Sequence, residues 1–538
     1  MCERHDDEER CAARCLLLMP AGVSSACLLR QSGAHYDADA VSAAARRARS
    51  RHEGRNRPRA IGSAISSSVT QVSNRAMKAI SVGPLLLLAA TTAALSNAHV
   101  QLRTPRPLVA RRPGSPNAEL SAAIARPAAS ASQGRGMRPS FLWALLSNWL
   151  YFLSLALNAI NMSFMVRLAV NGNLKPSAAS IALSGNVEAV DKLLTFLGVG
   201  YLCGLSDALG RKPLMLWSAL GFAMTNFLQA ASGGSRAGLY LADIIDGCSS
   251  CMTPVCQAYV VDCSMPASTA TNLGLFQGLS IGGAFIIAFP IGGLLGAKFG
   301  PRMPLLIAGV LQLLNALVIA LATPESNPAA RRAGKMDLRG ANPLGGLRRL
   351  FFHGATLRAA AASYFLVTLA RNSLDAQFVN YASVRFGWSQ QQTGPVMVLV
   401  GLMLAIVPRL MVPLLGLRLS LLSGLLVFAM GLVATALAPT PFGFVGGIAI
   451  VAFGCVSLPA LQAILASLAP VGERGALLGA LGSLTELTSA IGSTMYARLL
   501  AHFSSPAASV QVPGMHFLVA AALLLVAFGL NVFSASSA

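Results

Sequence analysis

The sequence of 538 residues carries a net charge of +21 at pH 7, and 54% of its residues are hydrophobic while only 11% are charged. Its mean hydropathy of +0.61 is too high for a soluble globular protein of this length. Its basic residues lie in a leader and in short loops between apolar runs, a pattern that the positive-inside rule of membrane proteins explains better than nucleic-acid binding does.

The first 139 residues differ from the rest of the chain. Residues 1–76 are rich in Ala and Arg, which predicts a disordered leader or a mis-assigned start. Residues 77–98 have the pattern of a signal peptide, with a basic Lys78, an apolar stretch and small residues before Ala98. Residues 99–139 are Arg-rich and nearly free of acids, like a transit peptide. A signal peptide followed by a transit-like stretch predicts a bipartite leader and a location in the plastid envelope. The alternative is that these residues are a disordered basic tail without a targeting signal, in which case the protein would lie in an endomembrane or the plasma membrane.

Twelve apolar runs follow residue 140, and each is long enough to cross a bilayer as a helix. They lie at about 141–168, 183–205, 213–232, 238–262, 271–295, 303–322, 359–383, 394–414, 419–438, 441–466, 476–500 and 515–534. Barrel strands are about half this length, so the runs predict helices. We therefore expect an all-α membrane protein of twelve transmembrane helices, in two six-helix bundles over 140–322 and 359–538 joined by a basic central loop, 323–358.

Loop charges predict the orientation of these helices. The central loop carries seven Arg and Lys residues, including Arg331 and Arg339, and other bases fall in loops on the same side. Both termini and this loop should therefore face the cytosol or its equivalent, such as a plastid stroma. A faint repeat supports the two bundles, because Gly210 after the second run is echoed by Gly416 after the eighth.

The stretch CGLSDALGRKP, residues 203–213, places one acid and two bases around a glycine between the second and third runs. Gly210 suits a tight turn, and Asp207 can accept hydrogen bonds from N–H groups at the start of the next helix. Arg211 and Lys212 should anchor the turn on the positive side. Together with Asp262 at the end of the fourth run, these residues predict a charge latch that closes in one conformation and opens in another.

This stretch resembles the signature of the major facilitator superfamily between its second and third helices, which Ser206, Asp207, Gly210, Arg211 and Lys212 match. The segments ALATPES (320–326), VRFGWSQQQTG (384–394) and VSLPALQAILASLAPVGERGALLGALGS (456–483) are similar to the tetracycline-exporter-like and hippocampus-abundant-transcript-like branch. The resemblance implies the major facilitator fold and secondary transport, with helices 1, 2, 4, 5, 7, 8, 10 and 11 around a cavity. The segment LADIIDG (241–247) departs from the family, with Asp243 where an Arg is expected.

Charged residues within membrane helices are costly and are functional candidates by default. The candidates for a substrate or proton pathway are Asp191, Lys192, Asp243, Asp246, Arg371, Asp375 and Glu486. Arg371 and Asp375 are four residues apart on one helix face and could form a static pair. Glu486 lies at a similar predicted depth to Arg371, so it either carries a proton or neutralises that cation.

No soluble-enzyme motif appears, since the sequence lacks a Walker loop, HExxH and GxSxG. Cys248 and Cys251 form a CxxC, which we interpret as small residues on a packed helix, so we expect no metal, no cofactor and no catalytic residue. We expect instead a monomeric secondary transporter of a small organic solute in a lipid bilayer, coupled to protons, with no nucleic-acid partner. The alternative is a transporter-like membrane protein that acts as a receptor, chaperone or scaffold.

Overall fold

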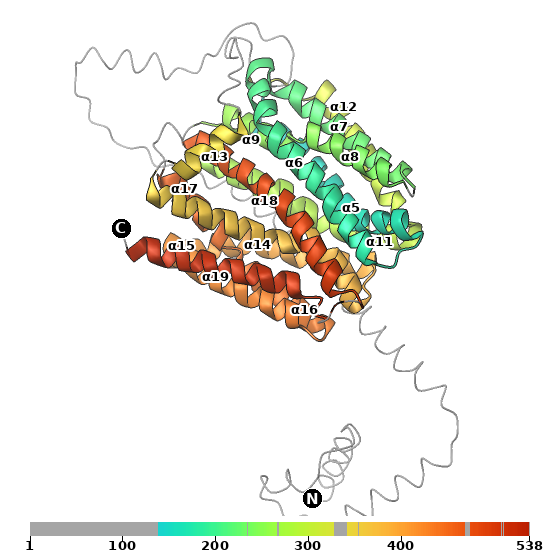
Figure 1. Cartoon of the computed structure of the whole chain (residues 1–538). Helices are drawn as coiled ribbons and strands as arrows, with labels where there is room; N and C mark the ends of the chain where they lie inside the picture. Colours follow the sequence, from blue (N-terminus) through green and yellow to red (C-terminus); the bar gives the residue numbers. More distant parts are fainter. Residues whose placement is uncertain are drawn as a thin grey trace, which may run out of the picture. The chain divides into compact units, whose positions relative to one another are not determined.

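The computed structural model describes residues 138–233, 235–265, 268–327, 342–352, 354–468, 474–506, 508 and 511–536. In these residues all regular structure is helical (Figure 1). The predicted leader segments 1–76 and 77–98, almost all of 99–139, and residues 328–341 of the central loop lie outside the described part.

The helices of the first half cover all six of its predicted runs. They are α5 (Phe141–Asn171), α6 (Ala178–Leu209), α7 (Arg211–Ala231), α8 (Arg236–Ser249), α9 (Met252–Cys263), α10 (Thr269–Gln277), the π-helix η1 (Gly278–Gly282), α11 (Gly283–Phe299) and α12 (Arg302–Leu321). The fourth run is therefore broken between α8 and α9. The fifth run is continuous from α10 through η1 to α11.

The second half has the same order of helices. They are α13 (Pro343–Phe352), α14 (Ala355–Phe386), α15 (Gln390–Leu437), α16 (Pro441–Gly454), α17 (Ser457–Leu468), α18 (Arg474–Phe503) and α19 (Met515–Ser536). α15 contains the eighth and ninth runs, joined at a kink where Gly416 has φ 74°. The helix α13 lies inside the predicted central loop, and α14 begins before the end of that loop, which sequence reasoning did not anticipate.

Eight helical segments of the described residues are long and apolar enough to cross a membrane. They cover eight of the predicted runs, and the other four, at 238–262, 359–383, 394–414 and 476–500, stay predictions as membrane spans. Three of these four runs carry charged candidates, and charged side chains lower the hydropathy of a helix that faces a polar interior.

Two ends of the helical bundle can be distinguished. We call the end with α13 and the turn at Gly210 the proximal end, and the opposite end, with the α5–α6 and α18–α19 connections, the distal end.

Side chains cap several helices at the distal end. Ser177 accepts a hydrogen bond of 3.2 Å from the Ser180 backbone N–H and completes a capping box at the start of α6. Thr440 caps α16 in the same way, before Pro441.

The two halves share their irregularities as well as their helices. The fourth run of the first half breaks at Ser250, and the fourth run of the second half breaks at Cys455. Gly210 and Gly416, which occupy corresponding turns, both have positive φ, 108° and 74°, with ψ near 165°. Only glycine adopts this conformation without strain, so the faint sequence repeat corresponds to a repeated backbone.

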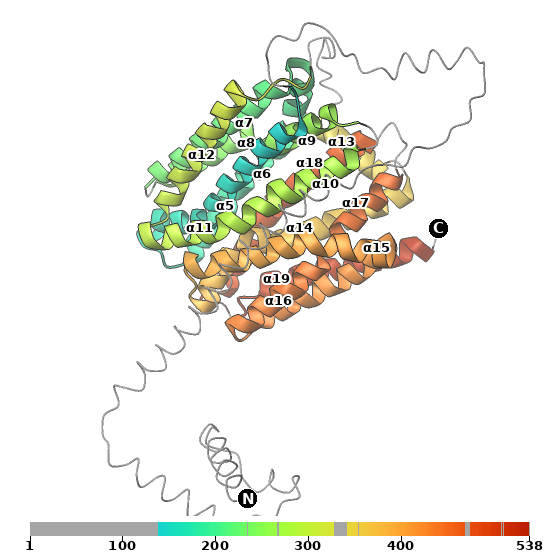
Figure 2. The same cartoon turned by 180° about the vertical axis from the view of Figure 1, so that it is seen from behind.

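The two halves pack against each other through two pairs of helices. α6 lies along α18, which Figure 1 shows, and α11 lies along α15, on the side seen in Figure 2. Ile181, near the distal end of α6, is buried in the large hydrophobic core of the second half. A Cβ added to Gly293 of α11 would lie 2.4 Å from the Gln390 backbone oxygen at the distal end of α15. The halves are therefore closely packed at the distal end.

Candidate functional site

The charged stretch that opens α7 forms a compact cluster at the proximal end. The Arg211 side chain is 10% exposed and pairs with Asp207 in the last turn of α6. Its Nε also donates to Asp262 Oδ2 of α9 at 3.1 Å, and its Nη1 donates to Ser206 Oγ at 2.7 Å. We call Asp207, Arg211 and Asp262 the proximal cluster. All three belong to the first half, so the cluster ties α6, α7 and α9 of one bundle together.

Two details of this cluster differ from the sequence prediction. The start of α7 is capped by Glu325, not by Asp207. Glu325 Oε1 accepts from the Arg211 backbone N–H at 2.9 Å, and its Oε2 accepts from that of Lys212 at 3.1 Å. The Lys212 ammonium donates to the Ala320 carbonyl at 2.9 Å instead of pairing with an acid of the cluster. The segment after α12 is thus held at the start of α7 by a carboxylate on a positive helix end.

A second group of charges lies deeper, where the two halves meet. Lys192 Nζ of α6 is 2.8 Å from Asp191 Oδ2, and the Asp191 side chain is 9% exposed. Glu486 of α18 interacts electrostatically with Lys192 and Asp191, although it belongs to the second half. Asp246 of α8 interacts with the same two residues. We call these four residues the interhalf cluster.

One oxygen of Asp246 is unusual within this cluster. Its Oδ1 is buried, and no hydrogen-bond partner for it lies among the described residues. Tyr151 of α5 is an electrostatic neighbour of Asp246. Because a buried carboxylate oxygen without a hydrogen bond is costly, this side chain is a place where a proton or a bound solute would supply the missing interaction.

Asp243 is an electrostatic neighbour of Asp191 and Lys192, and it also joins a hydrogen-bond network inside the first half. Its Oδ1 accepts a hydrogen bond of 2.8 Å from Gln229 Nε2 of α7. Gln229 Oε1 in turn accepts from Asn158 Nδ2 of α5 at 2.6 Å, and Asn158 also donates to Asn226 Oδ1 at 2.9 Å. Asp243 is 6% exposed. The acid that replaces the expected Arg is thus held by neutral amides that join three helices.

Arg371 and Asp375 form the pair that their spacing predicts. Arg371 Nε is 3.1 Å from Asp375 Oδ2, and their side chains are 40% and 56% exposed in the middle of α14. The pair faces the first half, because Asp375 is an electrostatic neighbour of Glu188 of α6. The carboxylate beside Arg371 is therefore Asp375, and the charged neighbours of Glu486 include Lys192, Asp191 and Asp246.

The broken helices lie beside these charges. Asp246 precedes the break at Ser250 by one helical turn, and Arg371 is an electrostatic neighbour of Cys455 at the corresponding break in the second half. Paired discontinuous helices in the two halves of a transporter point to its binding region, because unwound backbone can contact solutes. We therefore take the charges and helix breaks between the halves as the candidate site.

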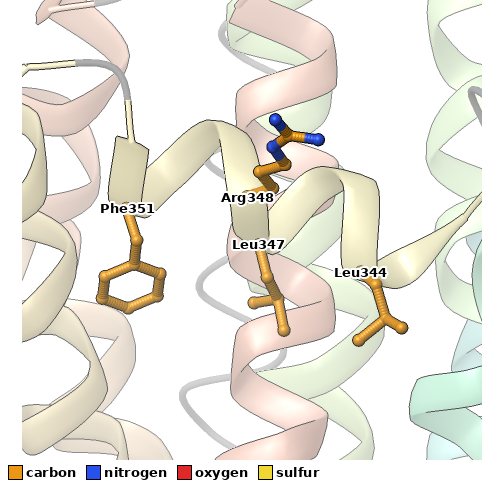
Figure 3. Close-up of a pocket in the computed structure, with 4 residues that line it drawn as sticks. All are labelled: Leu344, Leu347, Arg348 and Phe351. Atoms are coloured by element: carbon orange, nitrogen blue, oxygen red, sulfur yellow. The ribbon is translucent and has the colours of Figure 1, made fainter.

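The helix α13 carries a pocket that is separate from these charges. It is lined by Leu344, Leu347, Arg348 and Phe351. Figure 3 shows the three apolar side chains on one side of the helix and Arg348 on the other. Among the described residues no group of three or more His, Cys, Asp or Glu side chains is arranged to hold a metal ion.

Sequence reasoning missed several residues of these networks. Glu325 lay in a segment noted only for its family resemblance, and its distance along the chain from Arg211 gave no reason to join them. Gln229 is a polar residue near the end of an apolar run, and this position could have marked it as a candidate. Glu188 was not among the candidates, but it interacts electrostatically with Lys192, Asp191 and Asp375.

Comparison with known proteins identifies relatives of this chain. The tetracycline resistance protein of class C from Escherichia coli is 30% identical over 348 residues, which cover 64% of this chain and 85% of that protein. The human hippocampus abundant transcript-like protein 1 is 24% identical over 387 residues, covering 66% of this chain and 74% of that protein. These are the two branches that the sequence segments resemble.

Solved structures show the same fold. The crystal structure of the human organic anion transporter MFSD10 (TETRAN) matches with a TM-score of 0.57 at 22% identity, covering 73% of this chain and 99% of that one. The nucleoside transporter NupG matches with a TM-score of 0.57 at 13% identity, covering 73% and 98%. The family model of the Major Facilitator Superfamily matches residues 144–420. With its all-helical structure and two similar halves, the chain belongs to the major facilitator superfamily of transporters.

Proposed function

We propose that the protein is a secondary active transporter that couples the movement of a small organic solute to protons. The observation that carries this proposal is the interhalf cluster, in which Glu486 of the second half lies near Lys192 and Asp191 of the first. Transporters of two similar halves work by rocking one half against the other around a central site. A charge interaction between the halves must therefore change during each cycle.

Proton coupling follows from this change. While Lys192 lies near Glu486, its ammonium favours the ionised carboxylate. When the halves separate at this depth, Glu486 loses that neighbour, and a charged side chain inside a membrane protein is costly unless it is paired. Taking up a proton removes the cost. Glu486 is therefore our proposed proton carrier, and Lys192 is the neighbouring charge that it gains or loses as the conformation changes.

The other candidates have supporting roles in this proposal. Asp246 has an unsatisfied buried oxygen near the break of the fourth run, so we propose that it contacts the solute or its proton. Arg371 and Asp375, half exposed between the halves, would contact the solute from the second half. Asp243 would hold the helices of the first half in place. We propose that the proximal cluster acts as a charge latch that closes in one conformation and opens in another. No residue is proposed to be catalytic.

The experiment uses purified protein in proteoliposomes with an imposed pH gradient. The solutes to test first are those named for the relatives: tetracycline, organic anions and nucleosides. Uptake driven by the gradient and counterflow without a gradient are measured on the same preparations. No flux for any solute class, with folded protein in the membrane, would favour the alternative of a receptor, chaperone or scaffold.

The proton carrier has a test of its own. Glu486→Gln mimics the protonated carboxyl, so it should abolish uptake driven by the pH gradient and leave counterflow largely intact. Glu486→Asp keeps a titratable group and is the matched control, which should retain part of the gradient-driven uptake. Equal loss of both activities in Glu486→Gln would reject the proton-carrier role, since a structural role affects both.

Membrane, orientation and oligomeric state are also proposals. We propose a monomer with both termini and the central loop on the cytosolic or stromal side, in the plastid envelope if the leader acts as its pattern predicts. Epitope tags near Arg339 and after Ala538 should be accessible from the same side of the membrane. Accessibility from opposite sides would contradict this orientation.

A further inference from the structure

The distal end contains a buried cation that no carboxylate of the described residues neutralises. Arg167, near the end of α5, is 1% exposed. Its Nη2 donates to Asn380 Oδ1 of α14 at 3.1 Å, and its Nη1 approaches the Leu174 carbonyl at 3.4 Å. The guanidinium carbon lies 4.2 Å from the centre of the Phe164 ring. Arg167 Nε is buried and has no hydrogen-bond partner among the described residues.

This environment is a poor one for a charge. Buried Arg side chains are almost always paired, because an isolated buried charge loses its hydration. An amide oxygen, a carbonyl and an aromatic face recover part of that loss. None of the ion pairs formed by the described residues includes Arg167. We call the arrangement in this structure, with the halves closely packed at the distal end, the distally closed state. Among the described residues it holds the Arg167 cation with neutral partners only, which limits how strongly this contact resists opening.

The contact also joins the two halves. Asn380 belongs to the second half, and it accepts from Arg167 of α5 while its Nδ2 donates to Ser184 Oγ of α6 at 3.1 Å. Glu188 of α6 also forms a side-chain hydrogen bond with Ser493 of α18, and two further polar contacts between the halves at this end are longer. Thr494 Oγ1 lies 3.5 Å from the Gly185 oxygen, and Gln390 Nε2 lies 3.5 Å from Asn161 Oδ1. Asn380 thus joins both α5 and α6 of the first half to α14 of the second.

We propose that Arg167, Asn380 and Ser184 form a distal clamp, the gate that holds this end of the transporter closed, and that the neutral partner of Arg167 keeps the gate reversible. In the closed state Asn380 bridges α5 and α6 to α14. On opening, Arg167 leaves Asn380 and regains water, which offsets the lost hydrogen bonds. A carboxylate in place of the Asn380 amide would bind the guanidinium more tightly and would hinder opening.

The test replaces Asn380 by an acid of the same shape. Gln390→Cys provides the reporter, because Gln390 is 3% exposed at the other distal contact between the halves and becomes accessible only when they part. Labelling by a membrane-impermeant maleimide from the distal side is measured in proteoliposomes, against protein without this cysteine. Asn380→Asp should slow labelling about tenfold or more, since close charge pairs in an interface couple strongly.

The charge partner is then removed. Arg167→Gln, with Asn380 unchanged, should speed labelling because the clamp is lost. In the double variant Arg167→Gln and Asn380→Asp, the slowing caused by the acid should disappear, and this non-additivity isolates the pair. All variants are first checked for a single symmetric peak on size exclusion.

Two results would overturn the clamp. The first is that Asn380→Asp leaves labelling of the reporter unchanged or faster. The second is that it slows labelling equally with and without Arg167. Since labelling needs no substrate and no proton gradient, the clamp can fail while the proposed transport function holds, and the reverse is also possible.

Discussion

Gly185 lies at a close approach of the two halves, and its replacement by alanine tests how much that contact matters. It lies in the distal part of α6, against the distal part of α18. A Cβ built on Gly185 would lie 2.3 Å from the Ala497 Cβ and 2.4 Å from the Ser493 backbone oxygen. The second of these is backbone and cannot rotate away. The variant can therefore be accommodated only if α6 and α18 move apart.

The size of the effect follows from these distances. Carbon atoms pack at about 3.5–4.0 Å, so the two helices must separate by roughly 1 Å or more at this point. Overpacking of this kind costs about 1–3 kcal/mol. The cost applies only to the distally closed state. Since 1.4 kcal/mol corresponds to a factor of ten, the ratio of closed to open protein should fall by roughly 5- to 150-fold.

Alanine also has a higher helix propensity than glycine, by about 1 kcal/mol. This gain is the same in the open and closed states, because α6 is helical in both, and it cancels in their ratio. Gly529→Ala on α19 is the matched control. A Cβ at Gly529 meets nothing within 4 Å, so it changes propensity without changing the packing between the halves.

The assay is maleimide labelling of Gln390→Cys from the distal side. Gly185→Ala should raise the labelling rate, while Gly529→Ala should leave it unchanged. An unchanged rate in folded Gly185→Ala protein would refute the reasoning. It would mean that the α6–α18 contact adapts locally and does not set the balance between the closed and open states.

The remaining predictions concern the proximal end. Asp207→Asn should lower transport sharply, because it removes a charge from the predicted latch. The melting temperature should change little, because the Asp207 side chain is 57% exposed and such pairs contribute about 1 kcal/mol or less. Arg211→Ala should lower both transport and melting temperature, since it leaves the half-buried Asp262 without its cation. Equal melting temperatures of Arg211→Ala and Asp207→Asn would contradict this. Glu325→Ala should destabilise the protein by about 0.5–2 kcal/mol through the lost cap of α7, measured as a fall in melting temperature larger than that of Asp207→Asn. Gly210→Ala should cost about 1–3 kcal/mol because φ is 108°, and a normal melting temperature would show that the turn can relax.

Much of the architecture was predictable because it depends on local sequence. Apolar runs of membrane length specify helices without reference to the rest of the chain, since the bilayer offers the backbone no other hydrogen-bond partners. The turn glycine Gly210 and its counterpart Gly416 could be predicted for the same reason, because a positive φ is a local requirement. The pair Arg371 and Asp375 follows from helical spacing alone.

The partners of the other charges were decided only by the tertiary structure. Helical periodicity shows which residues share a face, but it does not show which helix that face meets. Glu325 therefore could not be assigned to the start of α7, nor Glu486 to Lys192 on the opposite half. Arg167 illustrates the limit best. The sequence shows an arginine near a helix end, where solvent is the ordinary neighbour, and only the packing of α14 against α5 buries it beside a neutral amide, because burial is a property of the assembled helices.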